Sequence, residues 1–222
     1  MLAMVSKFYY TIIFLVVCGV QLSSQISVGL RGGYTQAWPD YGDTELPEDA
    51  ETDVEGYNFS FVIYRKLSPT ISIGFEPGIV QRGAACFPGW QPIFLGDTKV
   101  NVSMLEFPLL VRKEISIPKT KISFAGKIGY GLSYAVSGKE TITPLEPNPQ
   151  PITSELDLND PELIIKRWDH GLYSGLEVGY HITQKHSIVA ETNFYLGMHN
   201  IDKINHTKNR SLGFSLGYVY TL

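Results

Sequence analysis

The final segment of the chain, RSLGFSLGYVYTL at 210–222, alternates apolar residues with small or polar ones without a break. A β-strand places successive side chains on opposite faces, so one face of this segment is apolar and the other is small and polar. In a water-soluble sandwich the apolar face points into the core, whereas in a membrane barrel it meets lipid. The pattern therefore predicts a strand, and whether its apolar face meets a protein core or lipid decides between a water-soluble protein and a membrane barrel.

Seven further segments alternate in the same way, which gives predicted strands at 25–37, 56–66, 70–82, 100–114, 121–137, 167–182, 187–199 and 210–222. Each is long enough for the roughly 9 to 11 residues that a tilted transmembrane strand requires. The connections alternate between long segments at 38–55, 83–99, 138–166 and 200–209 and short ones at 67–69, 115–120 and 183–186. This layout predicts an all-β fold, an eight-stranded antiparallel up-and-down transmembrane β-barrel with short periplasmic turns and long extracellular loops.

The N-terminal residues have the layout of a secretory signal peptide. Lys7 precedes an apolar run at 8–20, and small polar residues follow up to Ser24. Such an apolar core is too short for a helix that spans a membrane. We therefore expect residues 1–24 to be removed on export to the outer membrane and residues 25–222 to form the barrel domain.

Cysteine use and charge narrow the class further. A lipoprotein anchor at Cys18 is not favoured, because Val17 stands where a lipobox requires Gly, Ala or Ser. Loss of the signal peptide leaves Cys86 alone, so an intrachain disulfide cannot close the fold. The formal net charge of −4 argues against a nucleic-acid partner.

One segment resembles a known family. The sequence MLEFPLLVRKE at 104–114 is similar to a strand that recurs in the PorT-like family of Gram-negative outer-membrane barrels, and ISVGLRGGY, FEPGIVQRG and WDHGLYSGLEVGY resemble the family's first, third and sixth strands. The chain departs from the pattern at its last residue, Leu222, where barrels often end in Phe, and in a long acidic first loop. The resemblance implies an outer-membrane barrel and little about activity, because most members of the family have no assigned one; the family's namesake suggests a role as accessory to a secretion system.

The same strand phasing predicts charged residues inside the barrel. If Leu105 and Phe107 face lipid, Glu106 points inward, and the other strands then place four acids and four bases in the lumen: Arg31, Glu76, Arg82, Glu106, Arg112, Lys127, Glu177 and Glu191. Side chains can fill the lumen of eight strands, so we expect these groups to pair with one another and with Tyr64, Tyr173, Asn193 and Tyr195. For Glu106 the expected partners are Arg112, Lys127 and Arg31, in that order. A network that gates or conducts ions is the alternative.

The long loops are the expected seat of any specific binding. Acidic residues without a Lys or Arg among them fill the first loop: Asp40, Asp43, Glu45, Glu48, Asp49, Glu51, Asp53 and Glu55. Their spacing matches no EF-hand, so a solvated segment is favoured over a divalent-cation site or a contact with a basic partner. The second loop contains Phe87, Trp90 and Phe94, and three roles are open for this cluster: a cover over the barrel mouth, a position at the lipid interface, or a contact site. Four prolines predict a stiff, extended third loop: Pro144, Pro147, Pro149 and Pro151.

No catalytic, metal or cofactor site is predicted. The histidines fall in no metal-binding motif, and His186 and Ser187, the nearest candidates for a lipid-modifying pair, are adjacent in a strand and point to opposite faces. A soluble lipocalin-like barrel would need Glu106 and Lys127 on its outside. We therefore favour a non-enzymatic structural or surface-binding role over these two alternatives. The expected partners are outer-membrane lipid, the barrel-assembly machinery during insertion, and an envelope or secretion-system protein.

The strand pattern generates a direct prediction about location. We expect the mature protein to fractionate with the outer membrane and to migrate differently on gels before and after boiling, because a closed barrel resists unfolding by detergent. Cell fractionation followed by gel electrophoresis of heated and unheated samples measures both. Recovery as a soluble periplasmic species would contradict the barrel.

Overall fold

The computed structural model describes residues 25–40, 53–85, 96–144, 150–160, 166–201 and 207–222. Its strands are β1 (Ile26–Asp40), β2 (Val54–Lys66), β3 (Ile71–Phe75), β4 (Gly78–Ala85), β5 (Gly96–Ser116), β6 (Ile122–Pro144), β7 (Ile152–Glu155), β8 (Trp168–His181), β9 (His186–Gly197) and β10 (Lys208–Thr221). Within these ranges no helix is long and apolar enough to cross a membrane.

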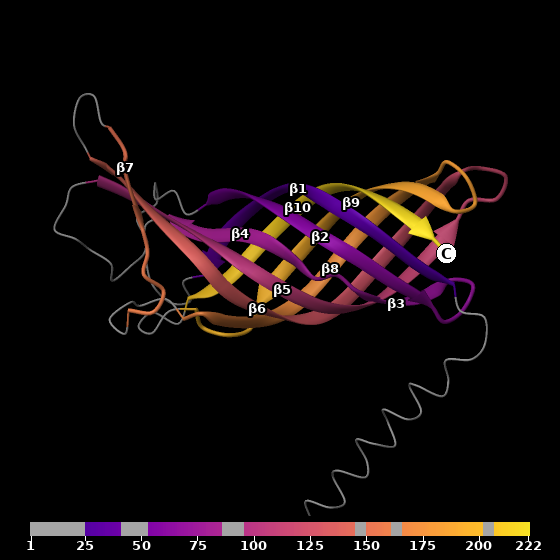
Figure 1. Ribbon diagram of the computed structural model, residues 1–222, viewed down its shortest axis with the longest axis horizontal. Helices are drawn as coiled ribbons and strands as arrows, with labels where there is room; N and C mark the ends of the chain where they lie inside the picture. Colours follow the sequence, from indigo (N-terminus) through magenta and orange to yellow (C-terminus); the bar gives the residue numbers. More distant parts are fainter. Residues whose placement is uncertain (1–24, 41–52, 86–95, 145–149, 161–165, 202–206) are drawn as a thin grey trace, which may run out of the picture.

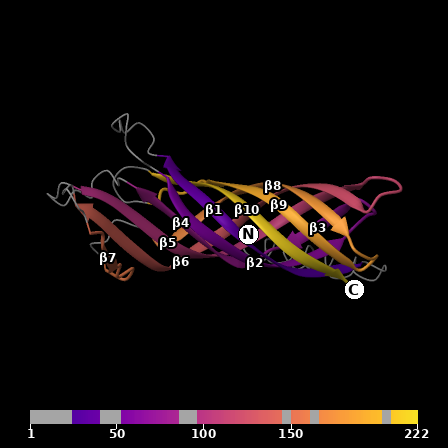
Figure 2. The same ribbon diagram turned by 90° about the horizontal axis from the view of Figure 1, so that it is seen from above.

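The strands form a closed ring (Figures 1 and 2). Every neighbouring pair is antiparallel, and β1 pairs with both β2 and β10, so the first and last strands close the ring. Strands β3 and β4 share the neighbours β2 and β5 and together occupy one position. The prediction of an all-β, eight-stranded, antiparallel up-and-down barrel is confirmed.

The predicted strand at 70–82 is interrupted at Glu76 and Pro77, between β3 and β4. Pro77 has no N–H to donate to the ladder, although its carbonyl oxygen still accepts a hydrogen bond from Phe61 N at 2.9 Å. The register with β5 is the same on both sides of the gap, since Phe75 pairs with Leu109 and Gly78 with Glu106. The interruption therefore leaves the inward direction of Glu76 unchanged.

The two ends of the barrel differ. Tight turns at 67–70, 117–121 and 182–185 lie at the same end as Leu222 (Figure 1). We call this the turn end and the opposite one the loop end. In the second turn Lys119 has a positive φ of 64° directly after Pro118, the geometry of a turn that favours Gly at this position. Such tight connections fix the register of the strands that they join.

The prediction that 138–166 is a loop without strands is wrong in part. Strand β6 continues to Pro144 and pairs with β7, and this hairpin extends beyond the ring at the loop end (Figure 1). A β-bulge, with the register shift between Ser103 and Met104 of β5, separates the extension from the rest of β6. The pairing continues past the end of β7, where Leu156 N donates to Gly138 O at 2.9 Å. Leu156 and Leu158 then pack against a buried apolar cluster of Val80, Val100, Val102, Met104 and Ala135.

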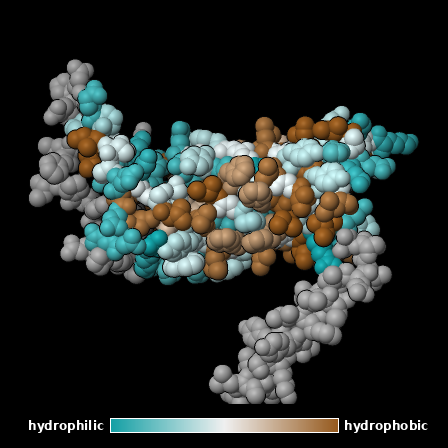
Figure 3. Space-filling view, in the orientation of Figure 1, coloured by the Kyte–Doolittle hydropathy of each residue, from teal (hydrophilic) through white to brown (hydrophobic). Residues whose placement is uncertain are grey.

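The outer wall of the barrel is apolar. Figure 3 shows apolar side chains spread over the wall, with the most hydrophilic residues toward both ends. Tyr57, Phe59, Tyr130 and Tyr218, four of the aromatics predicted to face outward, are exposed. The other two are half-buried, because Tyr134 packs on Trp168 and Tyr220 on His186. An apolar outside around a charged inside is the reverse of a water-soluble barrel, so the lipocalin alternative is wrong.

The close pairing of β1 with β10 can be tested at Gly33, with Gly126 of β6 as the matched control. A Cβ on Gly33 would lie 1.9 Å from Phe214 O, whereas a Cβ on Gly126 of β6 would meet nothing within 4 Å. We expect Gly33→Ala to lower the free energy of unfolding by about 1 to 3 kcal/mol through this clash, and Gly126→Ala to leave it unchanged or higher. Urea unfolding of protein refolded in detergent measures both, and equal effects would contradict the described pairing.

Candidate functional site: the barrel interior

Arg31 lies at the centre of the charged interior. It stands on β1, between outward Leu30 and Gly32, and its side chain is 1 % exposed. Its guanidinium forms ion pairs with Glu76 at 3.2 Å, with Glu177 at 2.5 Å and with Glu191. Nη2 also donates to the Tyr64 hydroxyl oxygen at 2.7 Å. One arginine therefore ties together carboxylates from β8, β9 and the gap between β3 and β4.

Two further cations complete this group. Lys127 of β6 pairs with Glu76 and Glu191, both at 2.7 Å. Arg112 of β5 pairs with Glu177 at 2.5 Å. Three acids and three bases thus balance one another across the lumen: Arg31, Glu76, Arg112, Lys127, Glu177 and Glu191. We call this set the central network.

The remaining predicted pair forms a separate site toward the loop end. Glu106 forms an ion pair with Arg82 at 2.5 Å and accepts a hydrogen bond from the Tyr173 hydroxyl at 2.8 Å. The guanidinium of Arg82 lies over the Tyr195 ring, 3.6 Å from its centroid. The predicted partners of Glu106, namely Arg112, Lys127 and Arg31, are wrong. Arg112 lies six residues along the same strand, roughly 20 Å away, and Lys127 is its register partner on β6. Arg31 pairs with the carboxylates of the central network.

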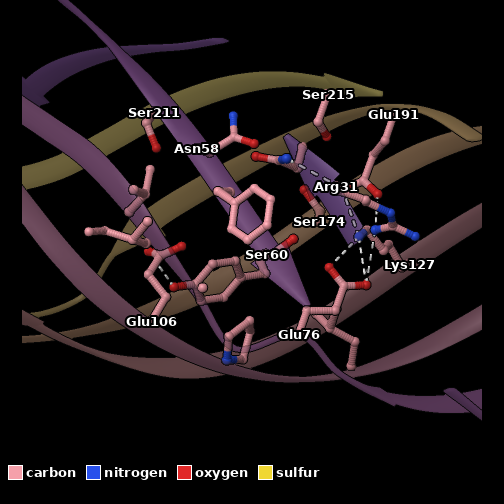
Figure 4. A pocket seen from close by; sticks show the side chains of 18 of the residues that line it. Arg31, Asn58, Ser60, Glu76, Glu106, Lys127, Ser174, Glu191, Ser211 and Ser215 are labelled. Carbon is pink, nitrogen blue, oxygen red and sulfur yellow. Dashed lines mark hydrogen bonds and ion pairs between the residues drawn. The ribbon is translucent and has the colours of Figure 1, made fainter. Parts of the chain in front are cut away.

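A small cavity of about 60 Å³ separates the two groups. Figure 4 shows Arg31, Lys127, Glu76 and Glu191 gathered on one side of it and Glu106 on the other. Within the described part of the chain Arg31 Nε and Arg82 Nη1 have no hydrogen-bond partner. Both residues line the cavity, which has room for a few water molecules that could satisfy them. A space of this size between packed side chains is not a channel.

Two further acidic residues lie on inward faces of the strands and were not predicted as interior. Glu114 is on the same face of β5 as Arg112 and pairs with it at 2.5 Å. Asp169 is on the same face of β8 as Tyr173 and Glu177, is 1 % exposed, and accepts a hydrogen bond from Asn209 Nδ2 at 2.8 Å. Extending the alternation to the strand ends would have identified both.

A polar cavity of about 130 Å³ opens at the turn end and contains a histidine. His181 Nδ1 lies 2.8 Å from Ser187 Oγ, and its Nε2 lies 3.1 Å from Ser123 Oγ and 3.6 Å from Glu114 Oε1. His186, in contrast, contacts the Tyr218 hydroxyl. The adjacent His186 and Ser187 therefore do not contact each other, and the histidine next to Ser187 is His181.

The loop predictions fall mostly outside the described residues. Phe87, Trp90 and Phe94 lie there, as do the signal peptide and most of the acidic first loop. Among described residues no three His, Cys, Asp or Glu side chains gather to hold a metal ion.

On the extension of β6, partial burial raises the pKa of Glu140, which pairs in register with Val100.

Comparison with known proteins gives one family and several solved structures. The model of the outer membrane protein beta-barrel domain matches residues 20–203. No curated protein sequence matches the chain. Neisserial surface protein A is 13 % identical, with 89 % of this chain and 97 % of that chain covered and a TM-score of 0.49. OprG from Pseudomonas aeruginosa is 12 % identical, with 88 % and 95 % covered and a TM-score of 0.49. Ail of Yersinia pestis is 15 % identical, with 90 % and 100 % covered and a TM-score of 0.39.

The Arg82–Glu106 pair can be tested by a mutant cycle. Glu106→Ala leaves Arg82 buried without its carboxylate, so we expect a loss of about 3 to 5 kcal/mol in unfolding free energy. Adding Arg82→Met should recover part of this loss, whereas adding Arg112→Met should deepen it. The exposed Glu155 is the control, and Glu155→Ala should cost less than about 1 kcal/mol. Urea unfolding in detergent measures all four variants, and recovery by Arg112→Met instead of Arg82→Met would contradict the pairing.

Proposed function

The chain belongs to the outer membrane protein beta-barrel domain family, and from this premise we propose that it is a non-enzymatic, non-conducting barrel of the outer membrane. The observation that carries the proposal is the interior, where the central network joins β1, β5, β6, β8 and β9 across the lumen. Beyond it the Arg82–Glu106 pair and the Leu156 and Leu158 side chains occupy the loop end. Because side chains fill the lumen, the proposed site of action is on the surface of the barrel.

We propose that this surface is the extracellular loop end, where β6 and β7 project beyond the ring. Its partner in this proposal is an envelope or secretion-system protein, as expected for a member of the PorT-like group in a Gram-negative cell. Lipid surrounds the wall, the barrel-assembly machinery inserts it, and residues 1–24 direct export as a signal peptide. The aromatic segment with Phe87, Trp90 and Phe94 is the proposed contact.

A second candidate function is hydrolysis of an ester, because Ser187, His181 and Glu114 lie within reach of one another. Two observations favour a structural role instead. Glu114 is held by Arg112 at 2.5 Å, and His181 Nε2 lies nearer to Ser123 than to Glu114. We expect a fluorophosphonate probe, which reacts with activated serines, to leave folded protein unlabelled. Labelling that Ser187→Ala removes and Ser123→Ala retains would establish the enzymatic alternative.

Conductance tests the main proposal. Folded protein in a planar bilayer should give no sustained large conductance, because charged side chains fill the lumen. Arg31→Ala combined with Glu191→Ala removes two facing side chains and should give small conductance steps, which shows that the assay detects inserted barrels. Stable channels of porin size from the unmodified protein would overturn the proposal.

A further inference from the structure

The outer wall has a depression of about 950 Å³ that extends over β1, β10, β9, β8, β6 and β5. Its floor contains outward positions with little or no side chain, namely Gly32, Gly126 and Ala190. A Cβ on Gly126 would meet no heavy atom within 4 Å, so the space above this residue is open. We call this depression the wall groove.

Large apolar side chains border the wall groove. Leu176 of β8 and Leu216 of β10 are each 67 % exposed and stand out from the wall as ridges. In register, Gly126 pairs with Leu176, and Leu216 pairs with both Ala190 and Gly32. The groove runs across the strands between rows of outward side chains, over the backbones of Ala125, Glu177, Glu191 and Ser215, which are register partners in turn. With neighbouring strands about 4.8 Å apart, the six strands span roughly 24 Å, the scale of an extended fatty acyl chain.

A cation stands at the end of this groove nearest the turns. Lys113 is on the outer face of β5, close to the turn at 117–121, and its register partner on β6 is Gly126. Its outward neighbours on β5, Val111 and Ile115, are 50 % and 61 % exposed. Among the described residues none forms an ion pair with Lys113. An ammonium group on a lipid-facing wall is stabilised by reaching an anion at the membrane surface.

We propose that the wall groove binds one phospholipid of the periplasmic leaflet, with its phosphate on Lys113 and one acyl chain along the floor at Gly126 and Ala190. The charge of Lys113 selects the phosphate, and the missing side chains provide room along the groove for an acyl chain. The site is distinct from the loop end proposed above, because it lies on the wall near the turn end.

Native mass spectrometry of the detergent-purified protein tests this site. The probes are dioleoylphosphatidylglycerol and dioleoylglycerol, which has the same acyl chains but no phosphate. The unmodified protein should retain one molecule of the phospholipid in preference to dioleoylglycerol. Lys113→Gln should reduce phospholipid occupancy about fivefold. The matched control is Lys185→Gln, which removes a charge at the same end, in the turn between β8 and β9 and outside the groove, and should change nothing.

A second pair of variants tests the floor of the groove. Gly126→Leu should abolish retention by filling the groove, and Gly126→Ala should preserve most of it. Heat-modifiable gel mobility verifies that each variant folds. If Gly126→Leu does not fold, the difference in phospholipid occupancy between Lys113→Gln and Lys185→Gln decides whether the site exists. Equal retention of the two lipids, or equal effects of the two lysine changes, would overturn the proposal. So would a dimer that Gly126→Leu dissociates, because another copy of the chain would then occupy the groove.

Discussion

The pairing of Arg31 with three buried carboxylates is the constraint on which the rest of the interior depends. A guanidinium and carboxylates removed from water are costly unless each meets an opposite charge in good geometry. Glu76, Glu177 and Glu191 come from different strands, and Lys127 and Arg112 balance their remaining charge. The paired residues face one another across the lumen, so the closed ring is what brings their charges together.

The molecule thus has a charged, internally paired interior and two surfaces, the outer wall and the loop end. The wall is apolar and meets lipid, with glycine and alanine at the places where it is hollowed. The loop end is extended by β6 and β7 and narrowed from within by Leu156 and Leu158. Because the central network fills the middle of the lumen in the described part of the chain, the proposed function lies at these surfaces.

Period-two alternation was enough to predict the strands and the inward direction of the charged residues, because a strand offers each side chain only two faces. It could not predict which charges pair. Glu106 joins Arg82 rather than Arg112, because Arg112 lies six residues along the same strand, roughly 20 Å away, where it pairs with Glu177 and Glu114. The choice of Arg82 depends on side-chain reach between strands of a closed ring, which only the three-dimensional structure contains.

The other differences have local causes. The break at Pro77 follows from a missing N–H, and the sequence alone did not indicate that the register would continue across it. The sequence predicts a loop where the β6–β7 hairpin forms, because the residues there are polar and flank a proline-rich segment, and the bulge in β6 shifts the alternation. His181 was missed as the neighbour of Ser187 because the two are separated by a turn and meet only across paired strands.

The most direct test of the central network compares two arginines that both form ion pairs. Arg31 is 1 % exposed among three carboxylates, whereas Arg210 pairs with Asp40 at the surface and its side chain is 40 % exposed. Urea unfolding in detergent should give a loss of about 3 to 5 kcal/mol for Arg31→Met, because buried carboxylates lose their partner. Arg210→Met should cost under about 1 kcal/mol. Equal small losses for the two variants would contradict the account of a barrel organised around Arg31.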